Sequence, residues 1–384
     1  MVTGRNENLS GRIRLGMVGG GNDAFIGGVH RIAARLDDKY ELVAGALSST
    51  PEKSQASGQA LGLPRIYDDY KQMAIREARL KSGIEAVAIV TPNHVHYAAA
   101  REFLKRGIHV ICDKPLTSTL ADAKKLVAAA ESSGALFILT HNYTGYPMVR
   151  QAREMVASGA LGNIRVVHAE YPQDWLTEEQ DFKQAAWRTD PARSGAGGAI
   201  GDIGTHAYNL ACFVTGMEAE SLSADMQAFV DGRQVDDNAH VMLRYPSGAR
   251  GMLWASQVAP GNENALRLRV YGDKGGLEWA QEDPNYLWFT PYGEPKRLIT
   301  RNGAGAGDAA ARMSRVPPGH PEGYLEGFAN IYSEAAAAIM AHRAGEDAPD
   351  GVLFPTVQDG LKGVQFVSAC VQSSKRNAAW VNLS

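Results

Sequence analysis

The sequence predicts an α/β protein in which a doubly wound parallel sheet is followed by an α+β region with an open, mostly antiparallel sheet. In the first third of the chain, short apolar runs alternate with amphipathic segments. Beyond Pro147, one amphipathic segment leads into a series of strand-like runs separated by turn residues. The chain has 384 residues, which is more than a single compact core usually holds, so two domains are expected.

The first domain is expected to span residues 1–140. Its apolar runs have the length of buried strands, and they read IRLGMV, YELVAGAL, EAVAIVT, HVICDKP and LFILT. The segments between them, such as AAAREFLKRG and ADAKKLVAAAESSG, carry apolar residues at helical spacing and end in glycine. Strands buried on both faces that alternate with helices indicate a parallel sheet covered by helices on both sides.

The second domain is expected to span residues 141–384. The helix-like MVRQAREMVASG and the strand-like IRVVHAEY precede a polar loop, and then come the runs SLSADMQAFV, NAHVMLRY, GMLWASQV, LRLRVYG, GGLEWA and YLWFT. Two long helices should follow, and the last could pack back on the first domain. An antiparallel sheet of this kind needs a cover on its second face, so we expect a homo-oligomer, a dimer or tetramer, formed through this sheet.

Composition narrows the range of partners. The 39 basic and 42 acidic residues are mixed along the chain and give a net charge of −3, so nucleic acid is not an expected partner. Neither a signal peptide nor an apolar run of the roughly 18 residues that span a membrane can be read, so no membrane association is expected. The cysteines Cys112, Cys212 and Cys370 are far apart, which fits a reducing, cytoplasmic setting.

A glycine-rich turn, VGGGNDAFIGGVHR, follows the first strand. A Rossmann-type dinucleotide site uses glycines here for a tight turn and for close approach of the pyrophosphate to a helix N-terminus. The third glycine stands further away than in G-x-G-x-x-G, and the alternative is a purely structural turn. The residues expected to contact the dinucleotide are Gly19, Gly21, Asn22, Phe25, Ile26 and Gly27.

The end of the second strand bears on which dinucleotide binds. An acidic residue usually grips the ribose at this point, but here the chain has Ser48 and Ser49, with Lys53 nearby. The serine hydroxyls could bond ribose hydroxyls or a 2′-phosphate. The absence of an arginine beside them favours NAD, with NADP not excluded. The alternative is that Ser49 or Thr50 caps the next helix.

The loops after the later strands carry further candidates, because ligands of open α/β sheets bind at the carboxyl ends of the strands. Lys114 in CDKPLT projects from such a loop, where an amine can stabilise a developing alkoxide or have its pKa lowered by burial. The alternative for Lys114 is an exposed loop lysine. The alternative for His96, at the start of the helix after the third strand, is a surface or capping histidine. The residues of these loops expected to contact cofactor are Thr91, Pro92, Asn93, His96, Asp113, Lys114 and Asn142.

The stretch AGGAIGDIGTHAYNLACFVTG places Asp202 and His206 four residues apart. If residues 200–214 form an α-helix, Asp202, His206 and Asn209 share one face and the apolar residues point elsewhere. A metal site needs three or four ligands, and no such cluster accompanies this pair, so no metal is expected. An ordinary helix start, with Asp202 near the positive end of the helix dipole, is the alternative.

Taken together, these motifs resemble the Gfo/Idh/MocA oxidoreductases, the family of glucose-fructose oxidoreductase and inositol dehydrogenase. The resemblance is carried by the GGG turn with His30 after Gly27, then TPNHVH, DKPL, GGAIGDIGTH and VYGDKGGLEW, in order along almost the whole chain. It implies a catalytic lysine in E-K-P and an Asp and a His in G-G-G-x-x-x-D-x-G-x-H, positions on which Lys114, Asp202 and His206 fall. Two departures are Asp113 in place of Glu and three extra residues in the glycine turn.

The resemblance implies oxidation of a secondary ring hydroxyl of a cyclitol or sugar by hydride transfer to nicotinamide. We expect His206 to act as general base, Asp202 to orient it or to hold a neighbouring hydroxyl, and Lys114 to stabilise the alkoxide. Arg188 could bind an anionic group. The residues expected to contact substrate are Lys114, Asn142, Tyr143, Tyr146, Asp174, Trp175, Arg188, Asp202, His206 and His320.

Two alternatives stay open at this point. One is an NAD-dependent glycoside hydrolase that oxidises C3 transiently and eliminates the aglycone, including that of an acidic, for example sulfonated, sugar; it needs a further base, for which Tyr146 or His320 could serve. The other is a catalytically silent nucleotide-binding regulator, against which the complete set of Lys, Asp and His argues.

Overall fold

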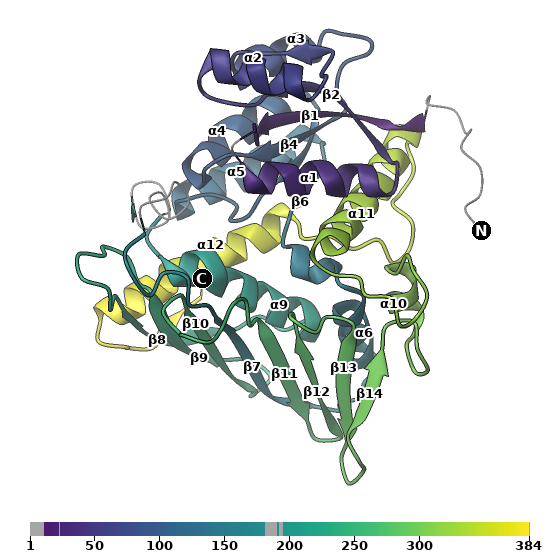
Figure 1. The fold of residues 1–384 in the computed structure, drawn as a ribbon. Coiled ribbons are helices and arrows are strands. Elements are labelled where there is room, and N and C mark those ends of the chain that lie inside the picture. Colours follow the sequence, from purple (N-terminus) through teal and green to yellow (C-terminus); the bar gives the residue numbers. More distant parts are fainter. Residues whose placement is uncertain (1–10, 23, 181–189, 192–194, 384) are drawn as a thin grey trace.

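A computed structural model describes residues 11–22, 24–180, 190–191 and 195–383 (Figure 1). The first part of the chain forms a six-stranded, all-parallel sheet. Its strands are β1 (Ile13–Gly19), β2 (Tyr40–Ala46), β3 (Arg65–Ile66), β4 (Ala86–Val90), β5 (His109–Cys112) and β6 (Phe137–Leu139). They lie in the order β3-β2-β1-β4-β5-β6. The strand order therefore reverses between β1 and β4, and sheets of this kind bind ligands at that point.

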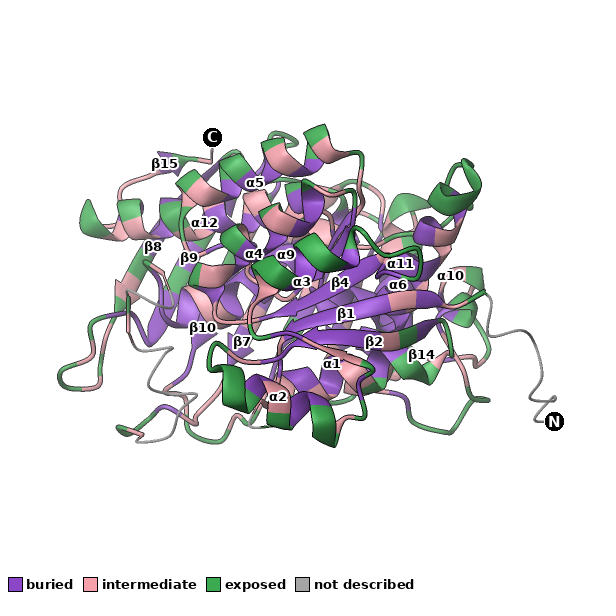
Figure 2. Ribbon diagram, turned by 90° about the horizontal axis from the view of Figure 1, so that it is seen from above, coloured by how far each residue is buried: buried purple, intermediate pink, exposed green. Residues whose placement is uncertain are grey.

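Helices cover both faces of this sheet, and their bounds are α1 (Phe25–Leu36), α2 (Pro51–Ala60), α3 (Tyr70–Glu77), α4 (Asn93–Leu104), α5 (Leu120–Ser133) and α11 (Tyr324–Ala344). The alternation of β4 shows the two layers: Ala86 and Ala88 join the core under α1 and α11, whereas Val87 and Ile89 join the core under α3, α4 and α5. Figure 2 shows the strands buried between outward-facing, exposed helix surfaces. The predicted doubly wound parallel sheet is confirmed.

The second part forms a nine-stranded mixed sheet in the order β14-β13-β12-β11-β7-β10-β9-β8-β15. The bounds are β7 (Ile164–Pro172), β8 (Ser221–Gln227), β9 (Asn238–Arg244), β10 (Arg250–Ser256), β11 (Arg267–Gly272), β12 (Gly275–Ala280), β13 (Tyr286–Pro291), β14 (Arg297–Thr300) and β15 (Val381–Asn382). Only the pair of β7 and β10 is parallel among the described strand pairs of this sheet, so the mostly antiparallel prediction is confirmed. The short edge strands β3, β14 and β15 were not predicted.

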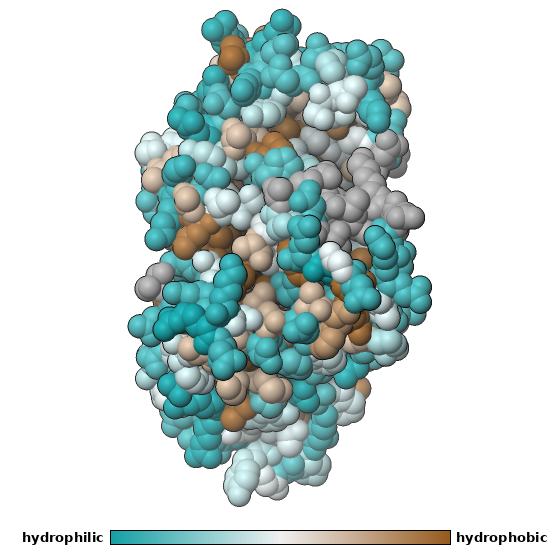
Figure 3. All heavy atoms as spheres, turned by 90° about the vertical axis from the view of Figure 1, so that its left-hand side faces the viewer, coloured by the Kyte–Doolittle hydropathy of each residue, from teal (hydrophilic) through white to brown (hydrophobic). Residues whose placement is uncertain are grey.

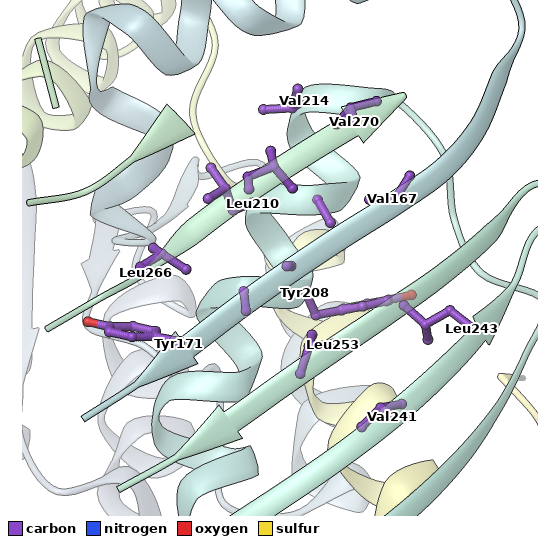
Figure 4. Close-up of a cluster of buried hydrophobic side chains, with 14 of the residues drawn as sticks. Val167, Tyr171, Tyr208, Leu210, Val214, Val241, Leu243, Leu253, Leu266 and Val270 are labelled. Atoms are coloured by element: carbon purple, nitrogen blue, oxygen red, sulfur yellow. The ribbon is translucent and has the colours of Figure 1, made fainter. Parts of the chain in front are cut away.

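One face of the second sheet packs on helices, as Figure 1 shows. The helices are α6 (Pro147–Ala157), α9 (Thr205–Thr215) and α12 (Val357–Lys375). Figure 4 shows Leu210 and Val214 of α9 among the apolar side chains of the neighbouring strands. On the opposite face of the sheet, Met242 and Met252 are paired across β9 and β10, and they are 53% and 43% exposed. Exposed large apolar side chains that gather on one face can mark a contact surface.

The late helices return to the first sheet. Arg315, in the segment between α10 (Asp308–Arg312) and α11, binds Asp37 at the end of α1. The Leu139 N–H of β6 donates to the Pro355 carbonyl just before α12, and α12 also contacts α5. The last helix thus lies against β6 and α5. The division into domains near residue 140 stays a prediction.

The segment with Asp202 differs from the continuous α-helix that the sequence predicted. Residues Ile200–Gly204 (η3) form a π-helical turn, and α9 begins only at Thr205. The buried Asp236 carboxylate accepts the N–H groups of Gly198 at 2.6 Å and Ile200 at 2.8 Å, which fixes the start of the turn. A π turn has more residues per turn than an α-helix and is frequent at functional sites. It changes the direction in which Asp202 projects relative to His206, so the simple i, i+4, i+7 face does not apply.

No helix in the described part of the chain is both long and apolar enough to cross a membrane. Within the same residues, no group of three or more His, Cys, Asp or Glu side chains is arranged to hold a metal ion. Figure 3 shows a largely hydrophilic face whose hydrophobic patches gather toward its middle.

Candidate active site

An ion pair joins the carboxyl edge of the first sheet to the helix layer of the second. Lys114 stands on the loop after β5, and its Nζ donates to the Asp202 Oδ1 at 2.8 Å and to the Asp202 backbone carbonyl at 2.7 Å. Both side chains are only 16% exposed. Because a single ammonium group binds both the carboxylate and the carbonyl of one residue, the position of Lys114 depends on the π turn that carries Asp202.

A run of amide side chains extends from Asp202. Gln257, just after β10, donates from Nε2 to the second carboxylate oxygen of Asp202 at 3.0 Å and lies 3.5 Å from Gln173 Oε1. Gln173 in turn donates to Asn264 Oδ1 at 2.7 Å and accepts a hydrogen bond from the Trp175 indole N–H at 2.9 Å. We call Gln173, Gln257, Asn264 and Gln281 the amide network.

The phenols of Tyr143 and Tyr171 join the amide network at Asn264. Their hydroxyl groups lie 2.5 Å apart, and Tyr171 donates to Asn264 Oδ1 at 2.7 Å. Asn264 donates to Gln281 at 3.0 Å, and Gln281 approaches the Tyr146 hydroxyl at 3.5 Å. Burial raises the pKa of all three tyrosines, so their hydroxyls stay neutral and serve as hydrogen-bonding groups.

His206 on the first turn of α9 is enclosed by other rings. Its ring centroid lies 4.9 Å from that of Tyr143 and 5.3 Å from that of His141, and the Nδ1 atoms of the two histidines are 3.5 Å apart. Burial lowers the pKa of His206 well below its usual value, the charges of Lys114 and His141 lower it further, and Asp202 opposes them. His206 is therefore uncharged near neutral pH and able to accept a proton.

Asp113 anchors the backbone of the Lys114 loop. Its Oδ1 accepts the Lys114 N–H at 2.9 Å and the Thr140 hydroxyl at 3.1 Å, and it lies 3.8 Å from His30 Nε2. Burial acts to raise the pKa of Asp113, but the His30 and Lys114 contacts outweigh it and lower the pKa. The Asp that replaces the usual Glu is thus ionised and committed to the loop.

His96 is placed beside the same loop. Its ring is fully buried, with Nδ1 at 2.8 Å from the Pro115 carbonyl and Nε2 at 2.9 Å from the Thr91 carbonyl. The ring therefore ties the turn after β4 to the turn after β5. This arrangement gives His96 a role in holding two cofactor-side loops, and its contact with cofactor stays a prediction.

The glycine turn is as tight as the sequence suggested. Gly19 has a φ of +76°, and a Cβ on it would lie 2.4 Å from the Val90 carbonyl oxygen. A Cβ on Gly27 would lie 2.4 Å from the Cα of Gly20, so α1 packs directly on the turn. The N-cap residue of α1, Ala24, makes no side-chain capping hydrogen bond. Helix N-termini at such turns bind anions such as a pyrophosphate.

At the same edge, Thr91 and Asn142 each have a buried polar atom with no hydrogen-bond partner among the described residues. These atoms are Thr91 Oγ1, after β4, and Asn142 Nδ2, in the short helix η2 (Asn142–Gly145) after β6. Buried donors and acceptors are normally satisfied, so these atoms point to a ligand that supplies the missing bonds. At the end of β2, Ser48 Oγ accepts the Thr50 N–H at 3.1 Å, whereas Thr50, the N-cap residue of α2, makes no capping bond with its side chain.

The remaining predicted residues are spread more widely. Asp174 accepts the Gly261 N–H at 3.2 Å, and Trp175 reaches the amide network through Gln173. His320 lies exposed in the segment before α11, where its carbonyl accepts a hydrogen bond from Arg301. Arg188 lies outside the described residues. Phe25, predicted to contact cofactor, is 65% exposed at the N-terminus of α1.

His141, Tyr171 and the whole amide network were not predicted from the sequence. His141 immediately precedes the predicted Asn142 and could have been included on that ground. Gln257 lies near the end of the strand-like run GMLWASQV and Asn264 shortly before LRLRVYG, but nothing in their local sequence distinguishes them from other polar residues near strand ends. Only the register of β7 between β10 and β11 brings their loops next to Asp202.

Comparison with known proteins gives two family matches. A model described as "Oxidoreductase family, NAD-binding Rossmann fold" matches residues 13–141, and one described as "GFO/IDH/MocA C-terminal domain" matches residues 149–278. An uncharacterized oxidoreductase of Bacillus subtilis, YfiI, is 35% identical, with 99% of each chain covered.

Solved structures are similar over the same length. An oxidoreductase from Sinorhizobium meliloti is 69% identical, with 96% of this chain and 99% of that chain covered and a TM-score of 0.89. An inositol dehydrogenase homologue from Azotobacter vinelandii, complexed with NAD⁺, is 36% identical, with 99% and 100% covered and a TM-score of 0.95. The same protein complexed with NADH and myo-inositol gives a TM-score of 0.90, with 97% of each chain covered.

Proposed function

Because the chain belongs to the Gfo/Idh/MocA family of NAD-binding oxidoreductases, we propose that it is an NAD-dependent dehydrogenase that oxidises a secondary ring hydroxyl of a neutral cyclitol or sugar. One observation carries this proposal. The Lys114–Asp202 ion pair is bonded to the amide network through Gln257, and the uncharged His206 lies at the same site.

The cofactor side of the site fits NAD. The turn between β1 and α1 can be this tight only because Gly19 and Gly27 lack a Cβ, and a turn of this kind brings a pyrophosphate close to the helix N-terminus. Thr91 and Asn142 each hold a buried polar atom that has no partner among the described residues. When bound, NAD supplies the hydride acceptor. The Ser48 hydroxyl at the end of β2 lies where the adenosine ribose is bound in such folds, and no acidic residue takes that place.

The proton side of the reaction falls to Lys114 and His206. Loss of hydride from a carbinol carbon requires loss of the hydroxyl proton, and an uncharged imidazole can accept it. We assign this role to His206. The Lys114 ammonium would stabilise the developing alkoxide, because a fixed positive charge stabilises an oxyanion strongly in a partly buried site. Asp202 would hold that ammonium in place.

The substrate side favours an uncharged polyol. The charge of Lys114 is paired with Asp202, Asp113 is bonded to the backbone of the Lys114 loop, and the network that extends from Asp202 and His206 consists of amides, phenols and imidazoles. Such groups recognise hydroxyls by donating and accepting single hydrogen bonds. The inositol dehydrogenase homologue that binds myo-inositol supports a cyclitol as the first substrate to test.

The glycoside hydrolase alternative needs a further base near the sugar. Burial raises the pKa of Tyr146, so its phenol stays protonated near neutral pH and has no phenolate to accept a proton. His320 is exposed, and its backbone carbonyl accepts a hydrogen bond from Arg301. These placements favour net dehydrogenation. The complete set of Lys114, Asp202 and His206 likewise argues against a silent regulator.

A substrate panel tests the proposal. The protein is incubated with NAD or NADP and with inositol isomers, free sugars, their phosphates or sulfonates, and chromogenic glycosides. We expect NADH and a ring ketone to accumulate in equal amounts with a neutral polyol. Cleavage of a glycoside without net NADH, or turnover of charged sugars only, would overturn the proposed reaction or the proposed substrate class.

Replacing Gly19 by alanine is expected to weaken NAD binding by tenfold or more. The left-handed backbone alone costs an alanine about 1–2 kcal/mol, and the new methyl group would lie 2.4 Å from the Val90 carbonyl oxygen. Calorimetric titration with NAD measures the effect. Gly107→Ala is the matched control, because Gly107 has a φ of +70° with nothing within 4 Å of its Cβ position. An equal loss of NAD affinity in both variants would contradict a specific role for the glycine turn.

The pH dependence of oxidation follows from the lowered pKa of His206. Protonation removes the base, so kcat/KM should fall as the pH falls through this pKa, with a midpoint below the usual histidine value of about 6.5. Above that pH the uncharged form is already complete, and the activity stays on a plateau until another group titrates. A profile of kcat/KM from acid to neutral pH checks this. A midpoint at or above the usual value would contradict the assignment.

We further propose that the open face of the second sheet forms a homo-oligomer. Large apolar side chains are exposed there, and they are Met242, Met252, Tyr271, Tyr286, Trp288 and Leu298. The double substitution Met242→Lys and Met252→Lys places two charges on facing positions of β9 and β10 and should shift the protein to a smaller species in analytical ultracentrifugation. An unchanged sedimentation coefficient would place the interface elsewhere.

A further inference from the structure

Two buried histidines of the candidate active site face each other through the same ring atom. His141 follows β6 and is 2% exposed, and His206 opens α9 and is 8% exposed. Their Nδ1 atoms lie 3.5 Å apart, and the two ring planes are nearly perpendicular at 86°. His141 belongs to none of the motifs used so far, and its ring has no assigned task in the reaction.

The geometry restricts the protonation of the pair. An uncharged imidazole has one N–H and one lone pair, so a bond between two Nδ1 atoms requires one ring to donate and the other to accept. If His206 donates, its Nε2 keeps a lone pair and can take a proton from substrate. If His141 donates, His206 Nε2 carries a hydrogen and cannot act as a base.

The charges around the pair keep both rings uncharged. Burial and the nearby Lys114 lower the pKa of both histidines, that of His141 to about 4, against weaker opposing effects of Asp113, Asp202 and Asp359. The phenols of Tyr143 and Tyr171 that pack on His206 stay neutral. Near neutral pH, the two possible arrangements therefore differ only in which nitrogen of each ring carries the hydrogen.

We propose that His141 is a positioning residue that holds His206 in the tautomer with its proton on Nδ1 and its lone pair on Nε2. The His141 Nδ1 then accepts from the His206 Nδ1–H both before and after His206 takes the substrate proton, so the ring does not turn during the reaction. This inference rests on the proposed function, in which His206 is the base.

A carboxylate usually orients a catalytic histidine by accepting its Nδ1–H. Here the oxygens of Asp202 accept from Lys114 and Gln257. An imidazole acceptor fixes the tautomer without adding a negative charge, and it therefore leaves the pKa of the base low. The base then stays uncharged beside the positive charges of Lys114 and the nicotinamide.

The test combines a tautomer readout with kinetics. His141→Phe keeps an aromatic ring but removes the acceptor, and His141→Asn keeps an acceptor near the position of Nδ1. The control is His109→Phe, which removes a buried histidine remote from His206; the Nδ1 of His109 accepts the Leu136 N–H. The chain has ten histidines, few enough for long-range ¹H–¹⁵N spectra of histidine-labelled protein, and His206→Asn assigns the His206 signals. The spectra are recorded without substrate, and kcat and KM with the best substrate of the panel.

In the unsubstituted protein and in His141→Asn, His206 should be protonated at Nδ1 and not at Nε2, and in His141→Phe the Nε2-protonated form should appear. We expect kcat of His141→Phe to fall by about tenfold to a hundredfold and that of His141→Asn to fall much less. His109→Phe should lower the melting temperature without changing the tautomer of His206.

A His206 protonated at Nε2 in the unsubstituted protein would overturn the inference, as would an unchanged tautomer in His141→Phe. Because the spectra need no turnover, they separate this inference from the proposed function. If the tautomer is as expected and His206→Asn retains full activity, the base assignment fails and the tautomer assignment stands.

Discussion

Replacement of Lys114 by methionine is expected to lower kcat by about 100-fold to 1,000-fold, the range seen when one oxyanion-stabilising donor is removed. Methionine has a similar length and fills the same partly buried space, but it cannot donate to the Asp202 carboxylate and carbonyl, which Lys114 contacts at 2.8 and 2.7 Å. The substituted site therefore loses its fixed positive charge while the Lys114–Pro115 loop stays anchored through Asp113. Steady-state kinetics with the best substrate of the panel measures the effect.

The control for this variant is Lys125→Met. Lys125 also pairs with an acidic residue, Asp122, at 3.3 Å, but it lies on the exposed surface of α5. Loss of that pair should leave kcat unchanged, since exposed ion pairs contribute little. If Lys114→Met and Lys125→Met had equal kcat values, the proposed role of Lys114 in stabilising the alkoxide would be wrong.

Substitution of His206 by alanine should lower kcat by about 100-fold to 10,000-fold, the range for loss of a general base. Its ring contacts Tyr143 and His141, whereas the glycine turn that would bind the dinucleotide lies at the end of β1, so NAD affinity should be retained. The acid limb of the kcat/KM profile should disappear along with the activity, because the group that titrates is gone.

The measurement for His206→Ala pairs titration of NAD with turnover. Retained NAD affinity with collapsed turnover is the expected combination. Undiminished turnover would remove His206 from the reaction. Loss of both together with a lowered melting temperature would show a structural defect, and His206→Asn, which preserves more of the packing, then separates the two effects.

Much of the fold followed from local patterns in the sequence. Buried runs such as that of β4 and the glycine turn after β1 are local signals, and they predicted the parallel sheet and its cofactor edge. The strands β3, β14 and β15 have two to four residues and lie at sheet edges. Runs this short carry too little periodicity to be distinguished from loops.

The candidate site was predicted only where its residues stand in local sequence motifs. Lys114, Asp202 and His206 stand in recognisable motifs, and the structure brings Lys114 and Asp202 into direct contact. The π turn at Asp202 was missed because it depends on hydrogen bonds that the Gly198 and Ile200 N–H groups donate to Asp236, which lies more than thirty residues further along the chain. His141 and the amide network were missed because their meaning comes from tertiary contacts and not from their neighbours in sequence.

Net hydride transfer from a ring carbon to NAD can be followed by isotope tracing. The preferred substrate is prepared with deuterium on the carbon that bears the reacting hydroxyl, and both products are analysed by mass spectrometry after turnover. We expect the deuterium in the reduced nicotinamide, with one ring ketone formed for each NADH. Deuterium recovered in the sugar product, with NAD left oxidised, would contradict net hydride transfer and would indicate a transient oxidation of the kind that cleaves glycosides.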